Sequence, residues 1–420
     1  MLRHSLAAAL AVVALTGCGG PAATHRPPAQ AAPPPPDSSD AHALPDEHRT
    51  DVSGTIVFAA DAGAGPGLTD AVDFGRVETH PMPMDLYLVL DGRPARRIVA
   101  TRAHERCPAL SPDGARLAHL AGRRVVVRPM DANGDLGAPE LVARLAQPPS
   151  RPRMALGSPC PLWSPDARHL AYRSGDGWTQ PVELHVLDMD GDDRVLASLP
   201  AGARANRLPM AFTWSPDAEA IAFTTAAGVR VVRLDGGPPE LVWHADADRS
   251  GAGYGDTGPI AVAWSSGDEL ALTVKTGHTV GVGWADDFTV HVVDLQTGRR
   301  QRLGEIHEYD SGAAWSPDAS RLAYVGPNGR IRVHDRATGT TTTLAPRRLG
   351  DVRRFRFWDV AWSPDGERLL ALARAETTQS SWGAGFSLVA VDPQTSAGTV
   401  VTPWTFAMDW INMTEVTWGP

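Results

Sequence analysis

A phrase of the form Trp-Ser-Pro-Asp, followed by a short apolar run, recurs along the chain and predicts a repeat architecture. The serines of the first six copies stand 53, 51, 50, 51 and 47 residues apart. Self-similarity at about 50 residues is typical of propellers and related arrays. The seven copies begin at Leu110, Trp163, Trp214, Trp264, Trp315, Trp362 and Trp418.

Each unit has the composition of four short strands. Ser-Pro-Asp-Gly is typical of a type I turn, because Pro presets φ at its second position. Three copies carry Ala instead of this Gly, which indicates that a positive φ is not required at Ala167, Ala218 and Ala319. Two further β-branched runs follow, such as 184–187 and 195–197. Four strands in about 50 residues make one propeller blade.

The two ends of the repeat region complement each other. The first unit starts at 55–58 without a preceding Trp strand, and the final strand, 415–418, has no unit after it. Joining them removes exposed sheet edges, which otherwise promote aggregation. We therefore expect an all-β fold over residues 51–420: a seven-bladed β-propeller of four-stranded blades, closed by the C-terminal strand joining the N-terminal blade.

This repeat resembles the TolB-type, WD-repeat-like propeller repeat of bacterial envelope proteins, over roughly residues 51–420. The resemblance implies a fold rather than an activity, because propellers host many functions. TolB-type proteins have six blades and an additional α/β domain. This chain counts seven blades and has no room for that domain, so the role of TolB is not inferred.

The N-terminal region is typical of a bacterial lipoprotein. Residues 1–17 combine a basic start, a short apolar stretch and small residues, as in a secretory signal peptide. Leu15-Thr16-Gly17-Cys18 resembles the lipobox, which implies a lipid anchor on Cys18; the alternative is an ordinary signal peptide with a coincidental Cys. Residues 18–50 are rich in Pro and Ala and predict a disordered tether. Gly19, rather than Asp, favours the outer membrane, at its periplasmic or surface side.

Charge and hydropathy limit the partners. The net charge of −9 argues against nucleic acid. No second apolar stretch is long enough to span a membrane, so the lipid anchor is the only membrane attachment we expect. We expect a monomer with an envelope protein as its partner.

The position four residues before each turn serine forms a predicted ring, because inner strands converge near the propeller axis. Cys107 and Cys160 occupy it in adjacent blades, which would allow a disulfide in an oxidising envelope; two separate buried thiols are the slightly favoured alternative. Asp359 and Glu415 are also ring neighbours, which could share a proton, bind a cation or simply be solvated in the channel. The remaining members are Ala211, Ala261 and Gly312.

Loop lengths predict that one face carries the binding function. Because blade strands alternate in direction, long segments gather on one face, the long-loop face, and short turns on the other, the short-turn face. The long segments are 61–84, 146–159, 244–259, 275–287, 346–357, 373–386 and 402–413. Aromatic residues in or beside them either bind a partner or pack over the blades. These are Trp178, Tyr254, Trp284, Phe357, Trp358, Trp382, Trp404, Phe406 and Trp410. The repeated phrase tryptophans are expected in the core between blades.

Two functions remain open. The first is a lipid-anchored scaffold that binds a protein or ligand through the long-loop face, with no cofactor or metal. The segments 131–135 and 188–192 resemble fragments of calcium loops but lack the distal Glu, so we interpret them as turns. The alternative is a lyase or hydrolase with a site at the channel mouth, for which His307, Asp310, Asp359 and Glu415 are candidates. The chain has no Gly-x-Ser-x-Gly, His-Glu-x-x-His or phosphate-loop motif.

Overall fold

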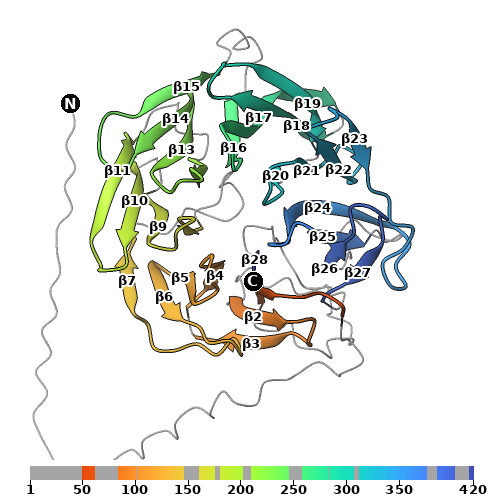
Figure 1. The fold of residues 1–420 in the computed structure, drawn as a ribbon, viewed down its shortest axis with the longest axis horizontal. Coiled ribbons are helices and arrows are strands. Elements are labelled where there is room, and N and C mark those ends of the chain that lie inside the picture. Colours follow the sequence, from red (N-terminus) through yellow and green to blue (C-terminus); the bar gives the residue numbers. More distant parts are fainter. Residues whose placement is uncertain are drawn as a thin grey trace, which may run out of the picture. The chain divides into compact units, whose positions relative to one another are not determined.

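Seven four-stranded antiparallel sheets surround a common axis in the computed structural model (Figure 1). The structure describes residues 50–61, 84–101, 103–145, 160–175, 180–201, 210–245, 258–281, 283–306, 312–375, 386–402 and 416–420. All of these belong to one compact unit, Ala41–Pro420, and none of them is helical. The predicted all-β, seven-bladed propeller is confirmed.

The blades are numbered here in chain order, each from its innermost to its outermost strand. Blade 1 consists of β28 (Val416–Gly419), β1 (Thr55–Asp61), β2 (Met84–Leu90) and β3 (Arg96–Val99). Blade 2 consists of β4 (Glu105–Leu110), β5 (Arg116–Ala121), β6 (Arg124–Pro129) and β7 (Leu141–Arg144). Blade 3 consists of β8 (Leu162–Trp163), β9 (His169–Ser174), β10 (Val182–Asp188) and β11 (Asp193–Leu199). Blade 4 consists of β12 (Phe212–Trp214), β13 (Ala220–Thr225), β14 (Gly228–Arg233) and β15 (Glu240–His244).

The last three blades repeat this order. Blade 5 consists of β16 (Gly258–Trp264), β17 (Glu269–Gly281), β18 (Gly283–Asp294) and β19 (Arg300–Ile306). Blade 6 consists of β20 (Ala314–Trp315), β21 (Arg321–Val325), β22 (Ile331–Asp335) and β23 (Thr341–Thr343). Blade 7 consists of β24 (Phe355–Trp362), β25 (Leu369–Ala375), β26 (Phe386–Val391) and β27 (Gly398–Val400).

The propeller is closed by the C-terminal strand, as the repeat pattern predicts. Strand β28 pairs antiparallel with β1, from Thr55 opposite Gly419 to Phe58 opposite Val416. The backbone N–H of Leu110 in blade 2 also donates to Thr417 Oγ1 at 3.2 Å. Blade 1 is therefore assembled from both ends of the repeat region, which lie side by side in Figure 1.

The repeated turn is held by its serine. In blade 3, Ser164 Oγ lies 2.5 Å from Asp166 Oδ1 and accepts the backbone N–H of His169 at 2.9 Å. The expectation that Ala could avoid a positive φ at the next position is wrong. Ala167, Ala218 and Ala319 have φ of 57°, 60° and 53°. The serine bonds fix the turn so tightly that alanine accepts a left-handed conformation, at a cost of about 1–2 kcal/mol each.

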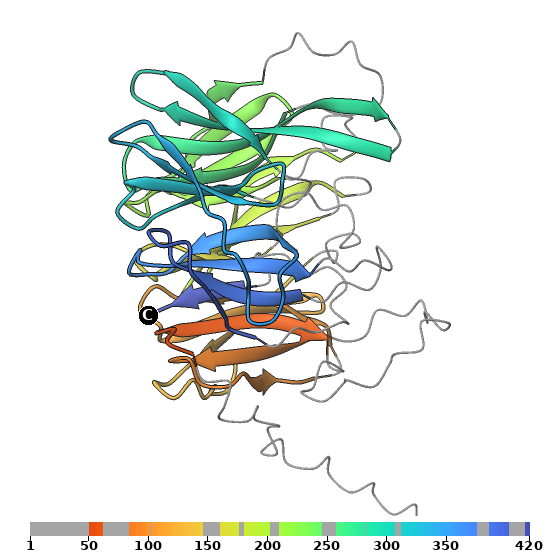
Figure 2. The ribbon, with the colours of Figure 1, turned by 90° about the vertical axis from the view of Figure 1, so that its right-hand side faces the viewer.

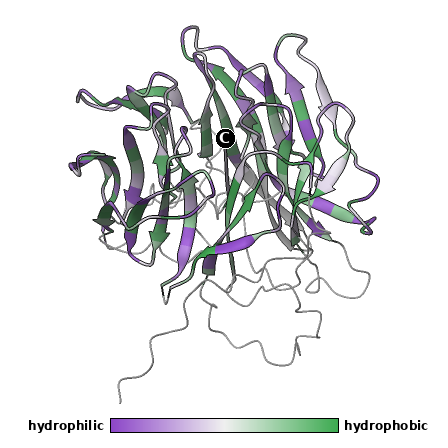
Figure 3. Ribbon diagram, turned by 60° about the horizontal axis from the view of Figure 1, so that its bottom comes forward, coloured by the Kyte–Doolittle hydropathy of each residue, from purple (hydrophilic) through white to green (hydrophobic). Residues whose placement is uncertain are grey.

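The repeated tryptophans join neighbouring blades, as predicted. The indole N–H of Trp163 donates to Ala109 O of blade 2 at 3.0 Å, and Trp214 donates to Leu162 O of blade 3 at 3.0 Å. Trp362 donates in the same way to blade 6. Clusters of apolar side chains fill the space between blades. Figure 3 accordingly shows hydrophobic residues along the strands and hydrophilic residues at the turns.

The two faces differ in their connections. The Ser-Pro-Asp turns lie on the short-turn face, where the C-terminus also ends (Figure 2). On the long-loop face, one expectation needs correction: the segment 275–287 is not a loop. Its residues extend β17 and β18 into a long hairpin, paired as far as Gly281 opposite Gly283. No proline interrupts the pairing there, and the register shifts once, between Lys275 and Gly277.

Candidate functional site

Most of the predicted site residues fall outside the part of the chain that the structure describes. On the candidate binding face these are Trp178, Tyr254, Trp382, Trp404, Phe406 and Trp410. At the channel mouth they are His307, Asp310 and Glu415, and at the N-terminus Cys18. The proposed pairing of Asp359 with Glu415 and the enzyme alternative therefore remain predictions.

Three aromatic residues of the predicted face lie on described strands. Trp284 lies in β18, opposite Val280 of β17. Phe357 is fully buried in the core between blades 6 and 7, so it packs rather than binds. Trp358 is half-buried, with the guanidinium carbon of Arg374 at 5.6 Å from its ring centroid. Trp358 is the residue that the register shift between Phe357 and Asp359 leaves unpaired, and it packs against the core between blades 7 and 1.

The pairing of three inner strands is irregular at the predicted ring. Strands β4, β16 and β24 each contain a register shift, next to Cys107, Ala261 and Asp359 respectively. Such bulges reorient side chains and occur often beside functional sites. Asp359 is 4% exposed, and its Oδ1 accepts the N–H of Val360 at 2.8 Å. In the described structure this carboxylate therefore supports its own bulge.

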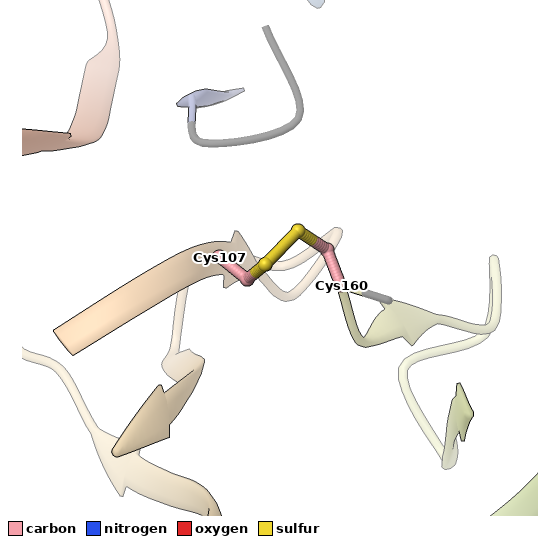
Figure 4. Close-up of a disulfide and its surroundings, with 2 residues drawn as sticks. All are labelled: Cys107 and Cys160. Carbon is pink, nitrogen blue, oxygen red and sulfur yellow. A yellow bond between two sulfur atoms is a disulfide. The ribbon is translucent and has the colours of Figure 1, made fainter. Parts of the chain in front are cut away.

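The two ring cysteines form a disulfide (Figure 4). Cys107 of β4 and Cys160, before β8, have Cα atoms 4.8 Å apart, and both side chains are buried. Of the two alternatives that the spacing leaves open, the structure contains the bonded form. The bond joins the inner strands of blades 2 and 3 at the long-loop end.

A hydrogen-bonded chain within blade 3 has the residue types of a catalytic triad. Ser174 Oγ lies 3.0 Å from His185 Nε2, and His185 Nδ1 lies 3.2 Å from Asp193 Oδ1. Tyr172 stacks on the His185 ring and donates its hydroxyl to Asp193, while burial and this bond raise the pKa of Tyr172. Ser174 is only 4% exposed, so a substrate carbonyl does not reach its hydroxyl. We interpret the chain as a network that satisfies buried polar groups.

An arginine-rich connection, residues 346–357, leads from β23 into the first residues of β24. Its apolar residues are buried in the core between blades 6 and 7: Leu349 is 0% exposed, and Phe355 is 5% exposed. Leu349 and Val352 exchange two backbone hydrogen bonds, of 2.9 and 3.0 Å, which form a tight turn. The arginines of this segment point to solvent. They are Arg347, Arg348, Arg353, Arg354 and Arg356.

A neighbouring turn supports the end of this connection. The backbone N–H of Phe357 donates to Gly329 O at 2.8 Å. Gly329 has φ +62°, and a Cβ there would lie 2.6 Å from Arg356 Cβ. The close approach therefore requires glycine, and it holds Arg356 in place beside Arg374, its cross-strand partner in β25.

The arginine-rich connection is positively charged, whereas the whole chain is negatively charged. Five arginines and one aspartate give 346–357 a formal charge of 5 − 1 = +4, in a chain whose net charge is −9. No carboxylate of the described residues lies within ion-pair distance of Arg347, Arg348, Arg353 or Arg354. Unpaired exposed arginines attract acidic groups.

Loop length alone predicts 346–357 as a long loop and does not reveal its charge. The signal was present, since five arginines stand within ten residues. The acidic balance of the whole chain concealed it. The other missing information was three-dimensional: the apolar residues between the arginines are anchors that fix the segment against two blades.

Comparisons with known proteins found similarity among solved structures. No protein-family model matches the chain, and no curated protein matches its sequence. Among solved structures, TolB from Acinetobacter baumannii matches with a TM-score of 0.43 and 16% identity, over 70% of this chain and 64% of TolB. The match spans less than two thirds of the length of that TolB, and the assignment of a seven-bladed propeller rests on the sheet topology.

Two further solved structures are similar at the same level. Hydrazine synthase of Kuenenia stuttgartiensis matches with a TM-score of 0.44 and 15% identity, over 66% of this chain and 78% of that one. An oligogalacturonate lyase in complex with manganese matches with a TM-score of 0.49 and 15% identity, over 75% of this chain and 84% of that one. Because all three identities are low, these similarities concern the fold alone.

Two absences apply to the described residues only. Within them, no three His, Cys, Asp or Glu side chains gather closely enough to hold a metal ion. The same residues contain no helix with the length and hydropathy to cross a membrane.

Proposed function

We propose that this protein is a lipid-anchored propeller of the bacterial envelope that binds an acidic protein partner through its long-loop face. The observation that carries the proposal is the arginine-rich connection. Its apolar anchors hold it against blades 6 and 7, so its exposed arginines are presented on a rigid support. A preorganised charged surface loses less entropy on binding than a free loop does.

Electrostatic attraction sets the expected properties of this binding. Exposed charges steer association and select partners more than they add affinity. Salt screens them, with a Debye length of about 8 Å at physiological ionic strength. Partner binding through Arg353 and Arg354 should therefore weaken as the salt concentration rises.

The test is a pull-down from detergent-solubilised envelope with the wild-type protein and two double variants. Arg353→Gln with Arg354→Gln should reduce recovery of a stoichiometric partner several-fold at low salt. The matched control is Arg168→Gln with Arg299→Gln, two exposed turn arginines on the short-turn face, which should leave recovery unchanged. Equal recovery with both double variants would show that the arginine-rich connection is not the binding surface.

Anchoring is tested separately. Cys18→Ser should block lipidation, so that the precursor or a soluble form accumulates instead of a membrane-bound protein. The readout is mass spectrometry of the mature N-terminus together with membrane fractionation. A wild-type N-terminus without lipid would refute the anchor and leave the partner-binding proposal standing.

A further inference from the structure

Arg173, the penultimate residue of β9, is a buried cation without an acidic partner among the described residues. It is 8% exposed, and its Nη1 donates to Met210 O at 3.5 Å. This contact is at the long limit for a hydrogen bond. A guanidinium has five N–H donors, and the other four have no partner among the described residues.

The propeller does not need a charge at this position. Arg173 is opposite Leu184 of β10, at a place that repeats in the second strand of every blade. The other six blades have neutral, buried residues there: Ala59, Leu120, Thr224, Thr273, Val325 and Leu372. At the equivalent position in six blades, uncharged side chains therefore fill the space between blades.

A buried and unpaired guanidinium is costly. Burial lowers the pKa of Arg173 to about 10, so the group is still charged at neutral pH. Buried charges in proteins are generally paired, and replacing a buried charge by a hydrophobic residue is often neutral or stabilising. Retaining Arg173 therefore weakens the free protein, and an incoming anion would offset that cost.

The surroundings place Arg173 where a ligand could arrive from the long-loop face. It stands one residue before the end of β9, the strand that runs toward that face. Cys160, bonded to Cys107, lies two residues before β8, the inner strand that pairs with β9. The disulfide therefore fixes the inner chain at the long-loop end of blade 3.

We propose that Arg173 anchors a binding site for a small oxyanion, the carboxylate or phosphate group of a ligand, at the long-loop end of the junction between blades 3 and 4. The planar fork of arginine matches both groups with two parallel hydrogen bonds. This site is independent of the arginine-rich connection, which belongs to blades 6 and 7, and it does not depend on the proposed partner.

The test compares thermal unfolding of the full-length protein in sodium phosphate, sodium acetate and sodium chloride at equal ionic strength. Phosphate or acetate should raise the melting temperature of the wild type by about 1–3 °C over chloride, since a ligand that binds only the folded state stabilises it. The anion that gives the shift identifies the group recognised. Arg173→Leu, which copies blades 2 and 7, should lose this shift and melt at least as high as the wild type in chloride.

The direction in which the variants change the melting temperature in chloride distinguishes a binding role of Arg173 from a structural role. If Arg173→Leu and Arg173→Thr, which copies blades 4 and 5, both lower the melting temperature in chloride or fail to fold, the guanidinium is structural and the proposal is wrong. The proposal also fails if neither anion shifts the wild type, or if the shift survives in the variants. Arg299→Gln, on the short-turn face, is the control and should keep the wild-type shift.

Discussion

Removal of the C-terminal strand tests how this propeller closes. A variant that ends at residue 415 lacks β28 and leaves the backbone edge of β1 unpaired from Thr55 to Phe58. It also loses two hydrogen bonds that tie β28 and the terminal proline to the start of blade 1: Thr55 Oγ1 to Pro420 O at 2.9 Å, and Trp418 Nε1 to Ser53 O at 3.1 Å.

The structure sets the size of the effect. Each of these backbone and side-chain hydrogen bonds contributes about 1 kcal/mol net. Fully buried tryptophans cost about 3–5 kcal/mol on truncation, so the half-buried Trp418 should contribute about half of that. The combined loss is about 6–8 kcal/mol, against a total stability of about 5–15 kcal/mol for a typical protein. The truncated protein should therefore unfold or aggregate near room temperature.

The assay is thermal unfolding followed by circular dichroism, together with size-exclusion chromatography. The control variant lacks residues 21–45 of the Pro- and Ala-rich segment, whose composition does not support a packed core, and it should melt like the wild type. A protein truncated after residue 415 that remains monomeric and melts like the full chain would refute closure by β28 and the count of seven blades.

Three further predictions follow from local structure. Replacing Cys107 and Cys160 by Ala opens a loop of 53 residues, which should lower the free energy of unfolding by about 4 kcal/mol; an unchanged denaturant midpoint would contradict this. Ala167→Gly should stabilise the protein by up to about 1 kcal/mol, since relief of the positive φ outweighs the greater backbone entropy of glycine in the unfolded chain; chemical denaturation measures it, and a loss of stability would contradict it. Hydrogen bonds from the Ser316 hydroxyl, and then from Ser320, lower the pKa of Asp318 from 3.8 to about 2. This contribution to stability is present above pH 4 and is lost as pH falls toward 2, so Ser316→Ala should raise the pKa of Asp318 measured by NMR titration, and an unchanged value would contradict the assignment.

The order and number of blades could be predicted because their determinants are local. Each blade is a meander whose strands pair with their chain neighbours, so strand composition and turn residues specify it without distant contacts. The closure by β28 also follows from counting strands at the two ends. Even within the turn, however, the left-handed φ of Ala167 was not predictable from composition. The hydrogen bonds of Ser164 favour this φ, whereas the Cβ of alanine disfavours it. Only the folded geometry shows that the hydrogen bonds prevail.

The sequence by itself determined a seven-bladed propeller, the convergence of the two cysteines and the role of the repeated tryptophans. Only the tertiary structure decided that the cysteines are bonded, that Phe357 is buried, and that Arg173 is enclosed without an acidic neighbour in the described residues. The physical reason is the range of the interactions. A strand or turn depends on residues a few positions apart. Burial and charge pairing depend instead on which side chains of neighbouring blades meet, and the repeated sequence pattern does not specify those contacts.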